Sequence, residues 1–383
     1  MKSRNNTASI ASKKHRGGNV LMLTCFMLVT IFGLLAFAVD LGIAYSNRAE
    51  MQRTADAAAL AAVSSLLEQR VNDPMAGTYS DALAKAEAAA FAAQNAVGRV
   101  SPALADADVE VGVLTDPNDP AGLIMPGLGL STTARVTVRR DAALNGETPF
   151  FFGQLFGVDS IPQYVMATAT YKSNFNGFQV ASNQSNLGIL PFALDEETYL
   201  DMMNYETSDD FTWDPDTQTI SAGGDGIPEA NLFPGDYGMP GNRGTVDIGH
   251  SGNSTNDIKR QILEGISPSD LAHHGGKLEF DENGVLILNG DTGISAAVKT
   301  QLNIIKGKPR IIPIFVEASG NGNNANYTIN RFVGIRIMDV KLTGSMKSKR
   351  VVIQPAIVSS LGAIQTTGTS HTSFIFSPVG LVK

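Results

Sequence analysis

The chain has 383 residues, of which 43% are hydrophobic, and a formal net charge of −8. That hydrophobic share is ordinary for a folded protein and excludes wholesale disorder, and the length allows two or three domains. An acidic chain lacks the Lys/Arg clusters that phosphate binding needs, so we expect no nucleic-acid partner. Charged residues are only 17% and glycines number 38, which indicates β-rich structure with many turns. The single cysteine, Cys25, excludes an intrachain disulfide and a cysteine-based zinc site.

The N-terminal stretch is basic and is followed by a long apolar run. Residues 20–39 read VLMLTCFMLVTIFGLLAFAV, without a charged side chain. Twenty helical residues span about 30 Å, the thickness of the hydrocarbon core of a bilayer. The basic residues before the run keep the N terminus in the cytoplasm. We therefore predict a cytoplasmic tail over residues 1–19, a transmembrane helix over residues 20–39, and an extracytoplasmic bulk beyond it. The basic residues of the tail are Lys2, Arg4, Lys13, Lys14 and Arg16.

Two processing events compete with a retained membrane helix. Ala36-Phe37-Ala38 has the small-x-small form of a signal-peptidase site, but the apolar run exceeds the usual ~7–15 residues of a signal peptide. Gly17 and Gly18 precede the run as in prepilins, yet Leu21 or Met22 stands where prepilins carry a glutamate. We expect the segment to be retained.

The residues after the apolar run predict that the helix continues outside the membrane until Pro74 stops it. Apolar or small residues recur at three- and four-residue steps, which gives one stripe on such a helix. The stripe comprises Leu41, Ala44, Arg48, Met51, Ala55, Ala58, Ala59, Ala62 and Leu66. Asp40 marks its membrane end, where the carboxylate reaches interfacial water or contacts a partner. Asp56 is interpreted as a solvated residue, with a functional contact as the alternative.

A second alanine-rich helix is predicted over residues 81–97. Ser80 can cap its start and Gly98 can end it. Short side chains allow close packing, so we expect either a helical hairpin with the first helix or contacts in a homo-oligomer.

The N-terminal signature resembles that of TadG-like Flp pilus-assembly proteins. An apolar run ends in AVDLG and is followed by Q-x-x-A-D-A-A-A-L-A-A. The resemblance implies a structural role in a Tad pilus, with other pilus-assembly or envelope proteins as partners. Many TadG proteins also carry a metal-binding D-x-S-x-S loop, which this sequence lacks. The signature residues, which the resemblance marks as interaction candidates, are Asp40, Gly42, Tyr45, Arg48, Gln52 and Asp56.

The remaining sequence predicts an α+β fold with a β-rich C-terminal half. Strands are expected at residues 109–113, 134–139 and 163–171, from alternating polar and apolar residues. With the two helices they form a membrane-proximal region over residues 40–172. A second extracytoplasmic α+β domain is expected over residues 173–383. Its expected elements are an irregular region at 207–244, helices at 255–266 and 294–306, a hairpin around Asn283-Gly284, and strands at 311–316, 328–342 and 351–358, the first with an edge or a bulge at Pro313.

Few residues indicate chemistry. Asp214, Asp216 and Thr217 form either a calcium loop or, as we expect, an Asx turn. Adjacent His273 and His274 make a poor chelate, even with His250. Asp247, His250 and Ser251 contain the residue types of a nucleophilic triad, but no G-x-S-x-G elbow or nucleotide-binding P-loop occurs. We expect no catalytic, cofactor-binding or metal site.

The sequence is compatible with three functions. The first is a membrane-anchored, non-catalytic pilus-assembly component. The second is an adhesive or ligand-binding ectodomain, with exposed loops such as Gly320–Asn324. The third is an extracytoplasmic hydrolase that uses His250 or His273.

Overall fold

The computed structural model describes residues 17–116, 118–180, 185–233, 244–249, 254–291, 293–320, 325–345 and 348–382, with side chains from residue 20 onward. Contacts divide the chain into two compact units. The first unit consists of Met1–Ala55, Ala92–Leu104 and Thr137–Met166. The second consists of Asp56–Phe91, Ala105–Val136 and Ala167–Lys383.

Helix α1, Gly17–Asn72, begins the described chain and is 56 residues long. The apolar run and the alanine-rich stretch lie in this one helix because neither contains a proline. It ends two residues before Pro74, as predicted. From Val20 it is long and apolar enough to span a membrane, a criterion that a signal sequence near the N terminus also meets.

The buried face of α1 starts within the apolar run and differs from the predicted stripe. Leu41 and Arg48 are exposed, whereas Asp40 and Asn47 are buried. The prediction was wrong at these positions because it ranked residues by apolar character, while polar side chains of α1 hold other parts of the first unit. Within the first unit, the buried face of α1 comprises Ala36, Asp40, Ala44, Asn47, Met51, Thr54 and Ala55.

A five-stranded sheet follows α1 in the order β2-β1-β3-β6-β22. Three of its strands confirm the predictions at 109–113, 134–139 and 163–171. Its last strand comes from the end of the described chain, where Gly380 lies opposite Thr170. The predicted boundary at residue 172 stays a prediction. The strands are β1 (Val109–Leu114), β2 (Ile124–Met125), β3 (Thr133–Arg140), β6 (Gln163–Thr170) and β22 (Gly380–Leu381).

The second alanine-rich helix is α2, Asp81–Gln94. The Ser80 hydroxyl accepts the N–H of Leu83 at 3.4 Å, which is the predicted cap. Gly98 follows with φ +54°, a conformation that glycine adopts readily. Short elements complete this part of the chain: η1 (Asp106–Asp108), β4 (Thr148–Pro149), η2 (Gly153–Phe156) and β5 (Ser160–Ile161).

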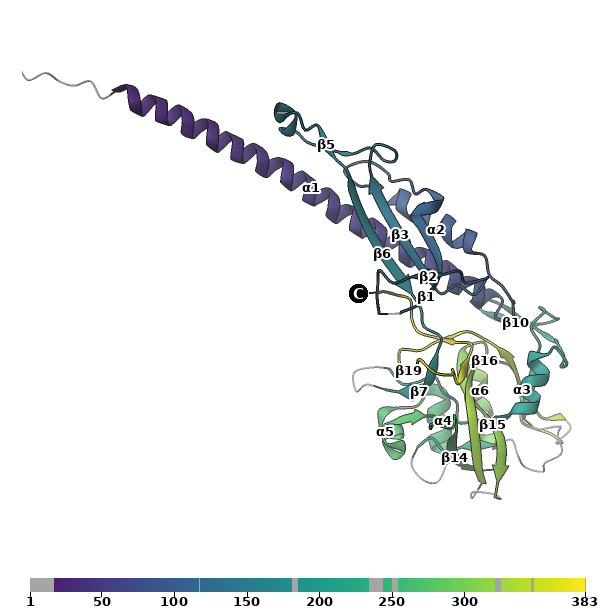
Figure 1. The fold of residues 1–383 in the computed structure, drawn as a ribbon. Coiled ribbons are helices and arrows are strands. Elements are labelled where there is room, and N and C mark those ends of the chain that lie inside the picture. Colours follow the sequence, from purple (N-terminus) through teal and green to yellow (C-terminus); the bar gives the residue numbers. More distant parts are fainter. Residues whose placement is uncertain are drawn as a thin grey trace, which may run out of the picture. The chain divides into compact units, whose positions relative to one another are not determined.

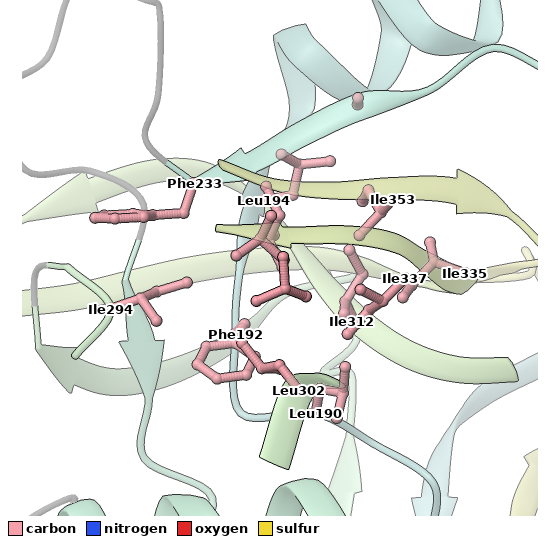
Figure 2. Close-up of a cluster of buried hydrophobic side chains, with 14 of the residues drawn as sticks. Leu190, Phe192, Leu194, Phe233, Ile294, Leu302, Ile312, Ile335, Ile337 and Ile353 are labelled. Atoms are coloured by element: carbon pink, nitrogen blue, oxygen red, sulfur yellow. The ribbon is translucent and has the colours of Figure 1, made fainter. Parts of the chain in front are cut away.

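The larger sheet of the second unit runs β11-β17-β16-β14-β12, with β15, β8 and β20 attached to it. Neighbouring residues such as Ile311 and Ile312 belong to different hydrophobic clusters, because successive side chains of a strand point to opposite faces. Figure 2 shows one cluster, with Phe192, Leu302 and Ile337 among its residues. The strands are β8 (Leu194–Asp195), β11 (Ala230–Phe233), β12 (Thr245–Val246), β14 (Leu286–Asp291), β15 (Pro309–Ser319), β16 (Ala325–Lys341), β17 (Arg350–Pro355) and β20 (Thr372–Ser373).

Short helices cover this sheet: α6 contacts β16, α4 contacts α6, and α3 contacts β15 and β11. Pro313 lies next to a register shift in β15, as predicted. The helices are α3 (Glu196–Met203), α4 (Thr255–Glu264), α5 (Pro268–Leu271), η3 (Ala272–His274), η4 (Ala296–Val298) and α6 (Lys299–Ile304). The remaining strands are β7 (Phe175–Gln179), β9 (Phe211–Asp214), β10 (Thr219–Ala222), β13 (Lys277–Glu279), β18 (Val358–Ser359), β19 (Ala363–Gln365) and β21 (Ile375–Phe376).

Two predictions for this region were wrong. The segment 207–244, expected to be irregular, contains β9, β10 and β11, and β9 pairs with β10 across a tight turn. Asn283-Gly284 forms a turn but no hairpin, because β13 pairs with β7 while β14 pairs with β12 and β16. The turn residues reverse the chain locally, and long-range pairing decides where the two strands go. The α+β class with a β-rich C-terminal half is confirmed.

Candidate functional site

The carboxylate of Asp40 binds three consecutive backbone N–H groups of the loop between β4 and β5. Phe151 and Gly153 each donate at 2.7 Å, and Phe152 donates to both oxygens at 3.1 Å. Consecutive N–H groups that point inward form a concave anion site. Asp40 is only 6% exposed, so its carboxylate does not lie in interfacial water as expected. The carboxylate accepts hydrogen bonds from loop N–H groups that have no partner in a sheet.

The loop adopts its shape through two glycines. Gly157 ends η2 with φ +77°, in the left-handed region. A Cβ on Gly153 would lie 2.5 Å from the carbonyl oxygen of Val158, a distance that real contacts do not reach. Val158 donates its N–H to Gly153 at 3.0 Å, and Phe150 donates to Asp159 at 2.9 Å. These bonds close a compact turn that aims its amides at Asp40.

A second polar contact lies further along the same face of α1. Asn47 donates to the Thr148 hydroxyl at 3.3 Å, and that hydroxyl donates to the Gln163 side-chain oxygen at 2.8 Å. Gln163 in turn donates to the backbone oxygen of Ala44 at 2.9 Å. All three side chains are buried. Sequence analysis missed them, although Asn47 follows Asp40 by seven residues, the spacing of one helix face.

The loop after α2 also binds this part of α1. Glu50 accepts the N–H of Gly98 at 2.7 Å, and the Thr54 hydroxyl donates to the backbone oxygen of Asn95 at 3.1 Å. Polar side chains of α1 therefore hold two separate segments of the first unit through their backbones.

The other signature residues do not gather around Asp40. Gly42, Tyr45 and Arg48 are exposed on α1, and a Cβ added to Gly42 would meet no atom within 4 Å. Gln52 donates to the backbone oxygen of Met166 at 3.2 Å. Asp56 is half-buried, in the second unit. The signature thus contains two residues that bind within the first unit and three that face outward.

Of the described residues considered for chemistry, Asp247 lies close to His274, and Asp214 lies in a local turn. Asp214 accepts the N–H groups of Asp216 at 2.9 Å and Thr217 at 3.2 Å, which is the predicted Asx turn. Hydrogen bonds from the Thr217 side chain and from backbone N–H groups lower the pKa of Asp214. Among the described residues, no group of three or more His, Cys, Asp or Glu side chains is placed to hold a metal ion. His250, Ser251 and residues 321–324 lie outside the described residues.

One buried acid in the second unit has a strongly shifted pKa. Glu229 is 2% exposed and accepts the N–H of Asp210 at 2.6 Å and of Phe211 at 3.1 Å. Burial, together with the nearby carboxylates of Asp209 and Asp225, raises the pKa of Glu229 to about 7, against the lowering effect of the two N–H groups.

Comparisons with protein families found two matches, both within residues 18–169. Residues 18–65 match a family described as Flp pilus-assembly, TadE/G-like, and residues 68–169 match a family described as Tad-like Flp pilus-assembly. Searches of curated proteins and of solved structures found no match. The first match contains Asp40, and the second contains the loop that binds it. Over these two adjoining regions, the chain is similar to Tad-like (Flp) pilus-assembly proteins.

Proposed function

We propose that the protein is a single-pass, non-catalytic component of a Tad (Flp) pilus-assembly apparatus, anchored in the bacterial inner membrane. In this arrangement the basic N terminus lies in the cytoplasm and the bulk lies outside it. Its partners are other pilus-assembly or envelope proteins, and the alanine-rich helices offer contacts for a homo-oligomer. The family match supports the role in pilus assembly.

One observation carries the anchoring part of the proposal. The side chains of α1 from Val20 to Val39 are almost all exposed, whereas the next residue, Asp40, is held by the chain itself. A soluble protein would not leave some 20 apolar residues in water, since each large side chain left exposed costs about 1.5–3 kcal/mol. The end of this exposed apolar stretch at Asp40 fits the outer end of a membrane helix.

The orientation can be measured by labelling single cysteines. In a Cys25→Ser background, one variant carries Ser12→Cys and another carries Leu361→Cys, an exposed position of the second unit. A membrane-impermeant maleimide should label residue 361 in intact spheroplasts and residue 12 only after lysis. Labelling in the reverse order would contradict the proposed orientation.

The assembly role needs a separate experiment. Deletion of the gene should abolish or reduce surface pili, and expression of the full chain should restore them. Unchanged piliation in the deletion strain, together with absence of the protein from purified pilus or envelope complexes, would contradict the role.

A further inference from the structure

The loop between β4 and β5, residues 150–158, exposes large apolar side chains. Phe151, Leu155 and Phe156 are 71%, 78% and 75% exposed. The sequence from Thr148 to Val158 contains no charged residue, and the nearest charges, Glu147 and Asp159, flank it. Exposed apolar patches of this kind mark a surface that binds something apolar.

The position of the loop along α1 indicates what that surface contacts. Its backbone lies against Asp40, the residue that directly follows the apolar run. Ala36, one turn earlier on the same face and about 6 Å nearer the N terminus, is 6% exposed. We infer that the loop covers Ala36 and so overlaps the end of the apolar run. Figure 1 shows β5 and the adjoining turn beside α1.

The chemistry of the loop favours lipid over a protein partner. Protein interfaces concentrate their binding energy in Trp, Tyr and Arg, and the loop has none of these. Segments that lie in the headgroup region instead bury an apolar face about 5–10 Å deep. A carboxylate without hydrogen-bond partners is energetically unfavourable at this depth. The carboxylate of Asp40 is stabilised there by three backbone N–H groups.

We propose that residues 150–158 form a second membrane contact, with Phe151, Leu155 and Phe156 inserted at the outer boundary of headgroups and acyl chains. The proposal rests on the membrane anchor proposed above. The protein then contacts the bilayer through both α1 and the loop, and the second contact fixes how deeply α1 lies in the membrane. Asp40 joins the two contacts.

The chain allows a direct measurement because it contains a single tryptophan, Trp213. In a Trp213→Phe background, full-length variants carry Phe156→Trp or Leu155→Trp as reporters in the loop. Phe32→Trp, in the apolar run, reports on membrane insertion, and Leu361→Trp, an exposed position of the second unit, is the matched control. Each variant is reconstituted into phosphatidylcholine vesicles with or without bromine on the acyl chains of both leaflets, so that orientation does not matter.

We expect bromolipid to remove most of the emission of the reporters at 32, 155 and 156 and to leave that at 361 unchanged. Quenching at 32 without quenching at 155 and 156 would overturn the loop proposal while keeping the anchor. Blue-shifted but unquenched emission at 155 and 156 would also overturn it, in favour of a protein contact. Absence of quenching at 32 would overturn the anchor and the loop proposal together.

Discussion

The two units are stabilised in different ways. Around α1, the first unit is held by polar side chains: Asp40 and Glu50 accept backbone N–H groups, and Asn47 donates to the Thr148 hydroxyl. The larger sheet of the second unit is held by two clusters of aliphatic and aromatic side chains on its opposite faces (Figure 2). A core of this kind tolerates loss of a single hydrogen bond, whereas the loop at Asp40 depends on one carboxylate. The comparison predicts which changes unfold the second unit and which release only a loop.

The largest effect is expected from a cavity in the second unit. Phe332 is fully buried and packs edge-to-face on Phe178 and Phe280, with ring centroids 5.1 Å and 5.4 Å away. Phe332→Ala should lower the free energy of unfolding by about 3–5 kcal/mol. Denaturant unfolding of the full chain in detergent measures it, with Ile287→Ala, an exposed position of β14, as the control. Equal losses for both variants would contradict a packed core.

The next effect concerns a polar group inside the second unit. Because the pKa of Glu229 rises from its ordinary 4.5 to about 7 on folding, the folded protein binds this proton more tightly. The stability from protonated Glu229 is present in full below about pH 4.5 and is lost as the pH rises through about 7. The loss is at most about 3–4 kcal/mol. Glu229→Gln should remove this part of the pH dependence of unfolding, and a slope that persists would contradict the assignment.

A smaller and local effect is expected at Asp40. Asp40→Ala leaves the N–H groups of Phe151, Phe152 and Gly153 without their acceptor, which costs about 1–3 kcal/mol. Hydrogen exchange of these amides should quicken while the unfolding midpoint of the second unit stays unchanged. Arg48→Ala, on the exposed side of α1, should alter neither quantity. A lowered unfolding midpoint for Asp40→Ala would mean that the two kinds of stabilisation are not separate.

The smallest effects are expected at two glycines, where substitution by alanine should change local stability in opposite directions. Gly157→Ala places a Cβ in the left-handed region without any steric contact, so it should loosen the loop by about 1 kcal/mol. Gly42→Ala, at an open position inside α1, should stabilise the helix by up to about 1 kcal/mol. Amide exchange over residues 150–158 and 40–46 measures both. The same sign at both positions would contradict the backbone argument.

The sequence predicted those parts of the fold that local patterns determine. Alternation predicted β1, β3 and β6, and the apolar run followed by the alanine-rich stripe up to Pro74 predicted one long helix. Local patterns failed where distant segments decide. Asn283-Gly284 has the residues of a hairpin, yet β14 finds its partners in β12 and β16.

The candidate site shows the same limit. The family signature included Asp40, but the groups that bind it lie more than 100 residues later in the chain. They are backbone N–H groups, which nearly every residue has, so no residue type identifies them in the sequence. Asn47 on α1 and Gln163 on β6 were missed because the sequence does not distinguish a buried polar residue from a solvated one until its partner is known. The predicted stripe of α1 therefore contained the exposed Leu41 and Arg48 and lacked the buried Asp40 and Asn47.

The central claim is that α1 remains part of the mature protein as its membrane anchor. The most direct measurement is the intact mass of the protein recovered from the membrane fraction after alkaline carbonate extraction. The account predicts a membrane-bound chain that retains residues 20–39. A soluble protein whose first residue is Val39 would contradict it.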